Sequence, residues 1–296
     1  MILNLLSQFW IAVVKSLRWM PIRGRSALAA FLALVFWVAI PKRRRVTLTN
    51  LRLCFPDKTP DERRRTARSF YKKLMRAALD HGVLWSGTRE EVASMVRFEG
   101  IENITEPVKR GETLIVIAPH FVGLDAVGIG LNLHVRGCSL YQKQSNPVWD
   151  AAALAGRRRF ADPELFAKHG HDDLKSVVRA MRKGLPFYYL PDLDHGRKNS
   201  IFIPFFGVPA ATIPMAGRLA KITKAKVCLC IAEMTDDGYV AHISPAWENY
   251  PTGDVEADTR RITAELEQWI VKLPDQYLWS HRRFKTRPLG ESSVYE

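Results

Sequence analysis

The sequence lacks several motifs that define well-known classes of enzymes and binding proteins. No Gly-x-Gly-x-x-Gly segment follows a predicted strand, which argues against a dinucleotide-binding enzyme. The Gly-x-Ser-x-Gly elbow is absent, which weakens the case for a serine hydrolase. No pair of Cys-x-x-Cys units exists, so we do not expect a zinc site. Zinc-finger spacing and the aromatic ribonucleoprotein motif are missing too, so charge alone supports nucleic-acid binding.

Cysteine is also scarce, with only four residues in a chain of 296: Cys54, Cys138, Cys228 and Cys230. Cys228 and Cys230 alternate along an apolar run, so we expect both side chains on one face of a β-strand. Reduced thiols in a cytosolic compartment are the simplest interpretation of this pattern. The sequence has no internal repeat, low-complexity tract or long linker, which favours one continuous α/β unit.

Positive charge, by contrast, is abundant. The 44 Lys and Arg residues against 30 Asp and Glu residues give a formal net charge of +14. A surplus of this size indicates an anionic partner, which can be a nucleic acid, an anionic lipid, a phosphorylated substrate or an acidic protein. Hydrophobic residues make up 47% of the chain, which is enough to bury a full core.

The N-terminal region, residues 1–45, contains two apolar stretches that favour attachment to a membrane. Apolar residues recur at helical spacing from Leu6 to Leu17, which predicts an amphipathic helix. Residues 26–40 carry no charge, but a helix of this length spans about 22 Å, less than the ~30 Å hydrocarbon core. A span helped by snorkelling side chains, an interfacial anchor and a buried core helix all stay open. A basic run follows at 42–45, so the positive-inside rule predicts that the rest of the chain is cytoplasmic.

Beyond residue 45, predicted helices and strands alternate. Thr59, Pro60 and Glu62 form a helix start with a capping box, and we expect this helix to run to about Trp85. Further strands are predicted at 114–118, 186–190, 201–205, 227–232 and 239–243, and further helices at 172–183, 211–223 and 254–272. This alternation favours a single α/β domain, residues 46–296, with a parallel or mixed central sheet flanked by helices. Residues 1–45 are predicted to be an N-terminal membrane-anchoring helical segment.

Residues 113–128 carry the strongest candidate for an active site. An apolar strand ends at Ala118, Pro119 stops its hydrogen-bonding ladder, and His120 follows at once with Asp125 five residues later. Positions i and i+5 of a helix do not face each other. The pair can therefore meet only if His120 lies in the turn and Asp125 in the first turn of the next helix, where Asp125 could orient the ring. A helix-capping aspartate beside an incidental surface histidine is the alternative.

Further segments form an ordered set with His120-x4-Asp125: Asn50–Pro56, Ala118–Phe121, Asn146-Pro147, Gly156–Arg159, Pro191–Gly196, Pro204–Thr212 and Gln276–Pro288. The set resembles the late lauroyl/myristoyl acyltransferases of lipid A biosynthesis, within the bacterial lysophospholipid acyltransferase-like superfamily, whose motif is His-x4-Asp/Glu. The likeness runs through most of the chain. Two positions depart from the family pattern: Asp125 stands where Glu is more frequent, and Gln142 stands where Arg is usual.

The resemblance implies an O-acyltransferase with a glycerolipid-acyltransferase-like domain and without a cofactor or metal. The implied donor is an acyl carrier protein thioester. The implied acceptor is the hydroxyl of a 3-hydroxyacyl chain on a phosphorylated, Kdo-linked lipid A precursor. His120 would act as general base, oriented by Asp125. The implied location is the bacterial inner membrane, with the catalytic domain on the cytoplasmic side, anionic lipids as further partners and no nucleic acid.

The matching motifs also imply a set of substrate-binding residues: Asn146, Arg157, Arg159, Asp192, Asp194 and Gly196. For several of them the sequence leaves a plain structural role open. Arg157 and Arg159 can hold a phosphate by paired N–H bonds, or they can form a basic helix face. Asp192 and Asp194 can bind sugar hydroxyls, order a basic loop, or serve as ordinary turn residues.

Two other functions stay open on the sequence alone. The same catalytic residues could acylate another lysolipid or an ornithine lipid, because only the acceptor pocket would differ. A basic, membrane-associated binding protein without enzymatic activity is the more remote alternative. It rests on charge alone and leaves the spacing of His120 and Asp125 unexplained.

Overall fold

A seven-stranded sheet lies at the centre of the protein, in a computed structural model that describes residues 2–168 and 172–295. The strand order is β1-β9-β8-β2-β5-β3-β4, and all neighbours are parallel except the antiparallel pair β8 and β9. Its strands are β1 (Val96–Glu99), β2 (Leu114–Ile117), β3 (Cys138–Tyr141), β4 (Glu164–Ala167), β5 (Phe187–Tyr189), β8 (Lys226–Met234) and β9 (Tyr239–Ile243). The predicted α/β fold with a mixed, mostly parallel sheet is confirmed.

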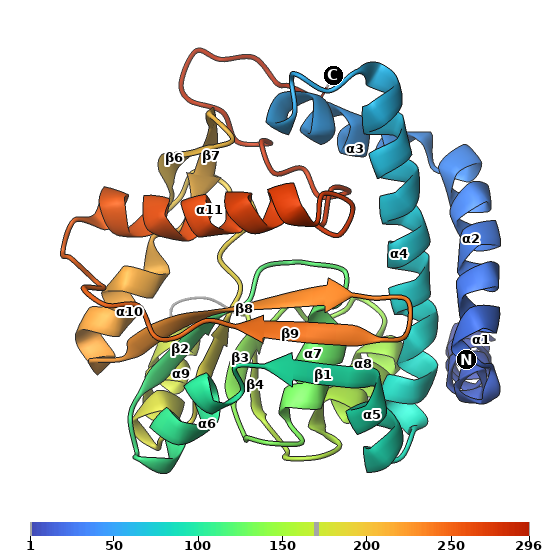
Figure 1. Ribbon diagram of the computed structural model, residues 1–296, viewed down its shortest axis with the longest axis horizontal. Coiled ribbons are helices and arrows are strands. Elements are labelled where there is room, and N and C mark those ends of the chain that lie inside the picture. The colour runs from blue at the N-terminus through green and yellow to red at the C-terminus, as the bar shows by residue number, and fades with distance from the viewer. Residues whose placement is uncertain (1, 169–171, 296) are drawn as a thin grey trace.

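Helices flank this sheet (Figure 1). In chain order they are α1 (Ile2–Ser16), the 3-10 helix η1 (Leu17–Trp19), α2 (Ile22–Ala39), α3 (Pro41–Cys54), α4 (Pro60–Ser86), α5 (Arg89–Met95), α6 (Glu102–Lys109), α7 (Leu124–Leu131), α8 (Pro147–Arg158), α9 (Asp172–Arg182), α10 (Met215–Thr223) and α11 (Val255–Lys272). A separate hairpin, β6 (Ile201–Phe205) and β7 (Val208–Thr212), contacts α11. Helices α4, α7 and α8 contact one another, and α9 contacts α10.

The centre of the sheet is β2, whose four residues are all fully buried. A parallel strand covered by helices on both faces needs a continuous apolar run, and Leu114 to Ile117 supplies it. On one side β2 pairs with β8, and on the other it pairs with β5. This position brings the carboxyl ends of three strands to one edge of the sheet, where ligand sites of α/β proteins form.

Helix α4 confirms the predicted helix start at Thr59. The Thr59 hydroxyl accepts from the Glu62 amide, and the Glu62 carboxylate accepts from the Thr59 amide, which completes the capping box. The helix ends at Ser86, one residue beyond the predicted end. The predicted start of α10 is too early, because residues 208–212 complete the β6–β7 hairpin and Pro214 separates it from the helix.

Helix α2 lies along α4 at one side of the molecule (Figure 1). It buries Ala29 and Ala33 and leaves Phe31 and Val38 more than 60% exposed. Arg25 Nε donates to the buried carboxylate of Asp80 on α4 at 2.7 Å, which ties the two helices together. Within the described residues, α2 is the helix that is long and apolar enough to cross a membrane.

Helix α1 confirms the amphipathic helix predicted near the N-terminus. Its apolar stripe is nevertheless turned outward, because Leu6 and Trp10 are more than half exposed while Ser7 and Ile11 are buried. The exposed apolar side chains of α1 and α2 therefore belong to adjoining parts of the same side of the protein.

Candidate active site

A cavity of about 650 Å³ opens beside the carboxyl ends of β2 and β5. Its walls are mainly apolar and come from α4, α7, β3 and β5, with Leu74, Ile129 and Leu140 among the lining residues. The polar side chains that reach it include both residues of the predicted catalytic pair: His81, His120, Asp125, Arg157, Asp194, His195 and His281. A mostly apolar cavity with a few converging polar groups is the usual form of a small-molecule or lipid site.

His120 lies in the turn after β2, as predicted, and its ring contacts Asp192. The Nδ1 atom lies 2.8 Å from Asp192 Oδ1, and the His120 backbone amide donates to Asp192 Oδ2 at 2.9 Å. The Asp192 side chain is only 2% exposed, whereas that of His120 is 20% exposed. Burial opposes ionisation of Asp192, but the facing His120 ring outweighs it and keeps the pKa of Asp192 below its usual range.

This contact determines which ring nitrogen of His120 carries the proton. A carboxylate can only accept at Nδ1, so Nδ1 carries a proton and Nε2 of the neutral ring is the basic nitrogen. No hydrogen-bond partner for Nε2 exists among residues 2–168 and 172–295. His120, which lines the apolar cavity, and Asp192 thus have the arrangement that a base and its orienting carboxylate require.

Asp125 lies in the first turn of α7, as predicted, but it contacts different groups. Arg157 of α8 donates from Nε and Nη2 to its two oxygens at 3.0 and 2.9 Å. His81 of α4 approaches Asp125 Oδ2 with Nε2 at 3.2 Å. Burial opposes ionisation of Asp125, but Arg157 and His81 together hold the pKa of Asp125 well below its usual range.

The expected contact between Asp125 and the His120 ring differs from the structure, in which Asp192 takes that position. The physical reason is the sheet register. Ile117 of β2 and Tyr189 of β5 are paired, and His120 and Asp192 each follow their strand's last residue by three positions. The two side chains therefore meet at the same edge. Asp125 is carried away from this edge by the turn of α7 and faces α4 and α8 instead.

His81 has acceptors at both ring nitrogens. Its Nδ1 atom lies 2.8 Å from the Ala77 carbonyl oxygen, and its Nε2 atom faces Asp125. Asp125 is thus held between His81 on one side and the Arg157 guanidinium on the other.

Two further histidines line the cavity near His120 and are neutral. Burial lowers the pKa of His281 to about 4, and burial also lowers the pKa of His195. The Nε2 atom of His281 accepts from the Asp194 amide at 3.1 Å, which requires that nitrogen to be unprotonated. The surroundings of His120 therefore hold uncharged rings, while Asp125 contacts the Arg157 guanidinium.

The C-terminal segment Gln276–Trp279 supports the His120 turn from outside the sheet. Val122 N donates to Gln276 O at 2.8 Å, and Leu278 N donates to His120 O at 2.9 Å. The Asn50 side-chain amide of α3 donates to the Trp279 and His281 carbonyl oxygens, which holds this segment in place. Parts of two motifs named in the sequence, Asn50–Pro56 and Gln276–Pro288, thus contact each other and together support the His120 turn.

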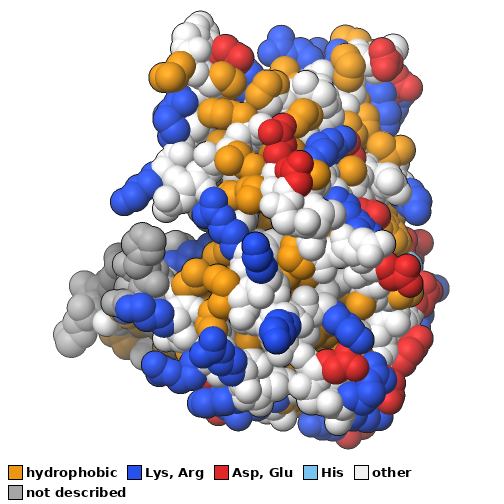
Figure 2. Space-filling view, turned by 90° about the vertical axis from the view of Figure 1, so that its left-hand side faces the viewer, with side chains coloured by type: hydrophobic (Ala, Val, Ile, Leu, Met, Phe, Trp, Pro, Cys, Tyr) orange, Lys and Arg blue, Asp and Glu red, His pale blue; other side chains and the backbone are white. Residues whose placement is uncertain are grey.

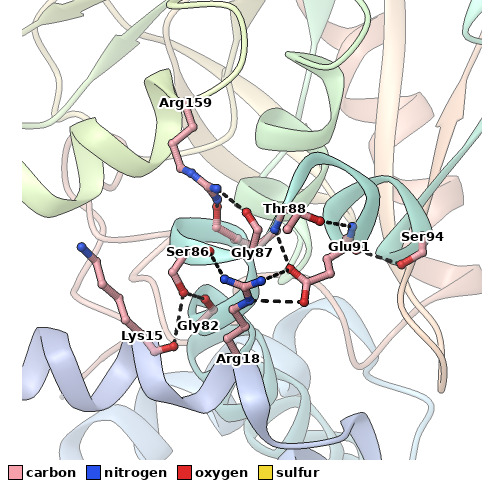
Figure 3. A network of polar contacts seen from close by, with 10 residues as sticks. Lys15, Arg18, Gly82, Ser86, Gly87, Thr88, Glu91, Ser94 and Arg159 are labelled. Carbon is pink, nitrogen blue, oxygen red and sulfur yellow. Dashed lines mark hydrogen bonds and ion pairs between the residues drawn. The ribbon is translucent and has the colours of Figure 1, made fainter.

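The structure gives Arg159 and Asn146 contacts within the protein. Arg159 donates to the Leu84 and Gly87 carbonyl oxygens and so caps the end of α4 (Figure 3). The Asn146 side-chain oxygen Oδ1 caps α8 by accepting from the Val148 amide at 2.9 Å. Their predicted role in substrate binding stays a prediction, and Arg157 is the arginine of this segment that reaches the cavity.

Asp194 and Gly196 shape the turn that carries Asp192. Asp194 Oδ1 accepts from the Gly196 amide, and its two oxygens accept from the Thr286 hydroxyl and amide. Gly196 has a φ of +93°, a conformation that favours glycine. Asp194 also lines the cavity, so its predicted substrate contact stays a prediction beside this structural role.

Sequence reasoning missed two features of the site. It did not identify Asp192 as the partner of His120, and it did not identify His81. One signal was available for Asp192, because both buried strands are followed by proline one residue before the polar side chain, at Pro119 and Pro191. Two strands that end in the same way can be neighbours with their ends together. No comparable signal marks His81, which lies inside a long helix 44 residues before Asp125.

Comparison with known proteins gives a consistent result over nearly the whole chain. Residues 3–286 match the family model described as bacterial lipid A biosynthesis acyltransferase. The chain is 31% identical over 259 residues to the lipid A biosynthesis palmitoleoyltransferase of Escherichia coli K12, covering 86% of this chain and 83% of that protein. It is 30% identical over 257 residues to the lipid A biosynthesis lauroyltransferase of the same organism, with the same coverage. It is 30% identical over 256 residues to the myristoyltransferase, covering 86% and 78%.

Proposed function

Because the chain belongs to the bacterial lipid A biosynthesis acyltransferase family, we propose that it moves a lauroyl- or myristoyl-like chain from an acyl carrier protein thioester to a hydroxyl of a Kdo-linked lipid A precursor. The observation that carries the proposal is the His120–Asp192 pair at the mouth of the apolar cavity. It supplies a neutral base beside a space suited to an acyl chain.

In the proposed reaction, His120 Nε2 takes the proton of the acceptor hydroxyl while the oxygen attacks the thioester carbonyl carbon. Asp192 stabilises the resulting imidazolium. The tetrahedral intermediate collapses, the carbon–sulfur bond breaks, and the leaving thiolate takes the proton back from His120. The chain needs no nucleophile of its own, and its four cysteines are buried with strongly raised pKa values.

Arg157 is the proposed electrostatic partner of the reacting groups. Its Nε and Nη2 atoms hold Asp125, while Nη1 has no hydrogen-bond partner among the residues that the structure describes. This free donor lies on a side chain that reaches the cavity, where it can bind the developing oxyanion or a phosphate of the acceptor. In this proposal Asp125 acts through Arg157 and does not touch the His120 ring.

We place the acyl chain in the apolar cavity between α7 and the sheet. Gly128 of α7 lines this cavity, and a methyl group added there would meet no other atom within 4 Å. Leucine at this position would fill space that a chain would otherwise occupy, and it suits a helix better than glycine does. Gly128→Leu should therefore shift the preferred donor to a shorter acyl chain, with Gly128→Ala as the milder control.

We further propose attachment to the inner membrane through α1 and α2, with the catalytic domain on the cytoplasmic side. Support comes from the exposed apolar side chains on these helices, including Trp10, Phe31 and Val38. The basic residues 42–45 lie directly after α2. Since one face of α2 is packed on α4, the helix offers only its other face to lipid.

The test is an acylation assay on detergent-extracted protein. Lauroyl and myristoyl carrier protein thioesters and a labelled lipid A precursor are supplied to the wild type and to the His120→Ala and Asp125→Ala variants. Product formation by the wild type, abolished in folded His120→Ala, supports the proposed reaction. Thioester consumption with a different lipid acceptor would overturn the assignment of the acceptor, and no consumption with any acceptor would overturn the proposed reaction as a whole.

A further inference from the structure

Helices α9 and α10 together present a strongly basic surface, which we call the basic face. Its members are exposed and make no hydrogen bond or ion pair through their side chains with any residue that the structure describes: Arg179, Arg182, Lys183, Arg218, Lys221 and Lys224. Figure 2 looks onto the side of the molecule on which α10 lies, and Lys and Arg side chains surround hydrophobic ones near its centre. No acidic side chain among the described residues forms an ion pair with any of these six cations.

The composition of the intervening chain explains the imbalance. Residues 172–226, counted from the start of α9, contain ten Lys and Arg residues and four acidic ones. Two of the acidic residues, Asp192 and Asp194, are buried, at 3% and 5% exposure, so neither reaches the surface to offset the charge. A surface of one sign attracts a partner of the opposite sign and speeds its association.

The position of the basic face argues against a membrane as its partner. Helices α1 and α2, which carry the exposed apolar side chains, lie at one side of the molecule, and α10 lies at the other (Figure 1). A protein attached through α1 and α2 therefore turns the basic face away from the lipid. The charge on this face suits a partner that arrives from the aqueous side.

A second cavity of about 290 Å³ lies between β5 and the two helices that carry this face. Leu174 of α9 and Met215 of α10 line it. Phe187 and Tyr189 of β5 line this cavity and not the main one, so it lies on the opposite face of the sheet from Asp125 and α7. The two cavities share residues at the end of the sheet beside His120: Leu140, Lys168, Tyr188, Leu190 and His195.

From these observations we propose that the basic face is the docking surface for an acidic carrier protein, which delivers its thioester arm through the second cavity. The inference rests on the proposed function, because it assumes a thioester donor. It adds where that donor binds and by which route the thioester reaches His120. The acceptor then approaches from the side of α1 and α2, so the two substrates use opposite sides of the protein.

The experiment compares two donors that differ only in the carrier. One is a lauroyl thioester on an acidic acyl carrier protein, and the other is the lauroyl thioester of free pantetheine, which has no acidic protein attached. The test variant combines Arg179→Glu, Arg218→Glu and Lys221→Glu. The matched control makes the same charge change at exposed positions of α3 and α4, through Arg52→Glu, Arg65→Glu and Lys72→Glu.

The test variant should raise KM for the carrier protein thioester about tenfold at low salt, with much less effect at high salt, because charge screening removes the same attraction. Its rate with the pantetheine thioester should stay at the wild-type level, which also shows that the variant is folded. The control variant should match the wild type with both donors. Single Arg218→Gln, a milder change, should raise KM in the same direction.

Three results would separate the possible failures. If the wild type uses both thioesters and the test variant keeps its KM for the carrier protein, the docking surface is wrong while the proposed function stands. If the control variant loses as much as the test variant, the effect comes from net charge and not from this surface, and the inference falls. If the wild type uses neither thioester, the proposed function itself fails.

Discussion

The two carboxylates of the site are built in different ways. Asp192 is almost completely buried, and both of its carboxylate oxygens contact one residue. One oxygen contacts the His120 ring, and the other accepts from the His120 backbone amide. The Asp125 side chain is 35% exposed and lies between the Arg157 guanidinium and the His81 ring. In the proposed reaction, the first arrangement orients a ring that gains and loses a proton. The second keeps a positive charge in place without moving a proton.

The difference shows that the two residues of one short motif can belong to separate parts of a site. We call His120 with its neighbours the His120 half, and Asp125 with Arg157 and His81 the Asp125 half. His120 and Asp125 are five residues apart, yet each has its main partner far away in the sequence. The His120 half contains neutral rings, whereas the Asp125 half contains permanent charge. We therefore expect changes in the two halves to affect activity in different ways, and the following variants test that division.

The largest effect should come from Asp192→Asn. An amide keeps the shape of the side chain but can no longer stabilise the imidazolium or impose the same ring tautomer, so kcat should fall by about 10³–10⁴-fold. The measurement is the initial rate with saturating acyl thioester, with thermal unfolding as the control for folding. A variant that keeps more than a tenth of wild-type kcat would show that Asp192 does not serve His120.

Asp125→Asn and Arg157→Lys should each lower kcat/KM by about 10²-fold, because each breaks the paired contact that aims the guanidinium. Since both act through the same contact, the double variant should be little worse than either single one. Purely multiplicative losses would mean that the two residues act independently and that the Asp125 half is not one unit.

The neutral histidines of the His120 half predict a dependence of stability on pH. His281 has a folded-state pKa of about 4, while an unfolded histidine takes a proton near pH 6.5, so stability is lost as pH falls between these values. The loss from pH 7 to pH 5 should be on the order of 1–2 kcal/mol from His281 alone. His281→Gln keeps an acceptor for the Asp194 amide but does not titrate.

Urea unfolding at pH 7 and pH 5 measures this effect. The wild type should lose more stability between the two conditions than His281→Gln does. Equal losses in both proteins would assign the pH dependence to other groups, of which His195, with a pKa lowered by burial, is the first to examine.

The smallest effect should come from His81→Gln. Glutamine keeps one N–H donor for Asp125 but lacks the second ring nitrogen, which contacts the Ala77 carbonyl oxygen, so kcat should fall about threefold to tenfold. His81 acts through Asp125, and the same substitution should therefore cost nothing more in an Asp125→Asn background. An undiminished loss in that background would mean that His81 touches the substrate directly.

Local features of this protein could be predicted from the sequence, while the pairing of distant residues could not. The apolar run 114–118 and Pro119 predicted the strand and turn, and i,i+5 geometry placed Asp125 correctly in the first turn of α7. The partner of His120 depends on which strand lies beside β2, and nothing local to residues 113–128 specifies β5. Likewise, the role of Arg159 at the end of α4 depends on how α8 packs against α4.

The support of the His120 turn by Gln276–Trp279 has a consequence for how the enzyme is made. The chain emerges from the ribosome in order, so the turn exists long before the segment that pairs with Val122 and His120. Until residues 276–281 are synthesised, Asn50 also lacks the carbonyl oxygens that it binds. The first helices of a nascent chain can therefore form long before the His120 turn has its support, and we expect activity only after residues 276–281 have been synthesised.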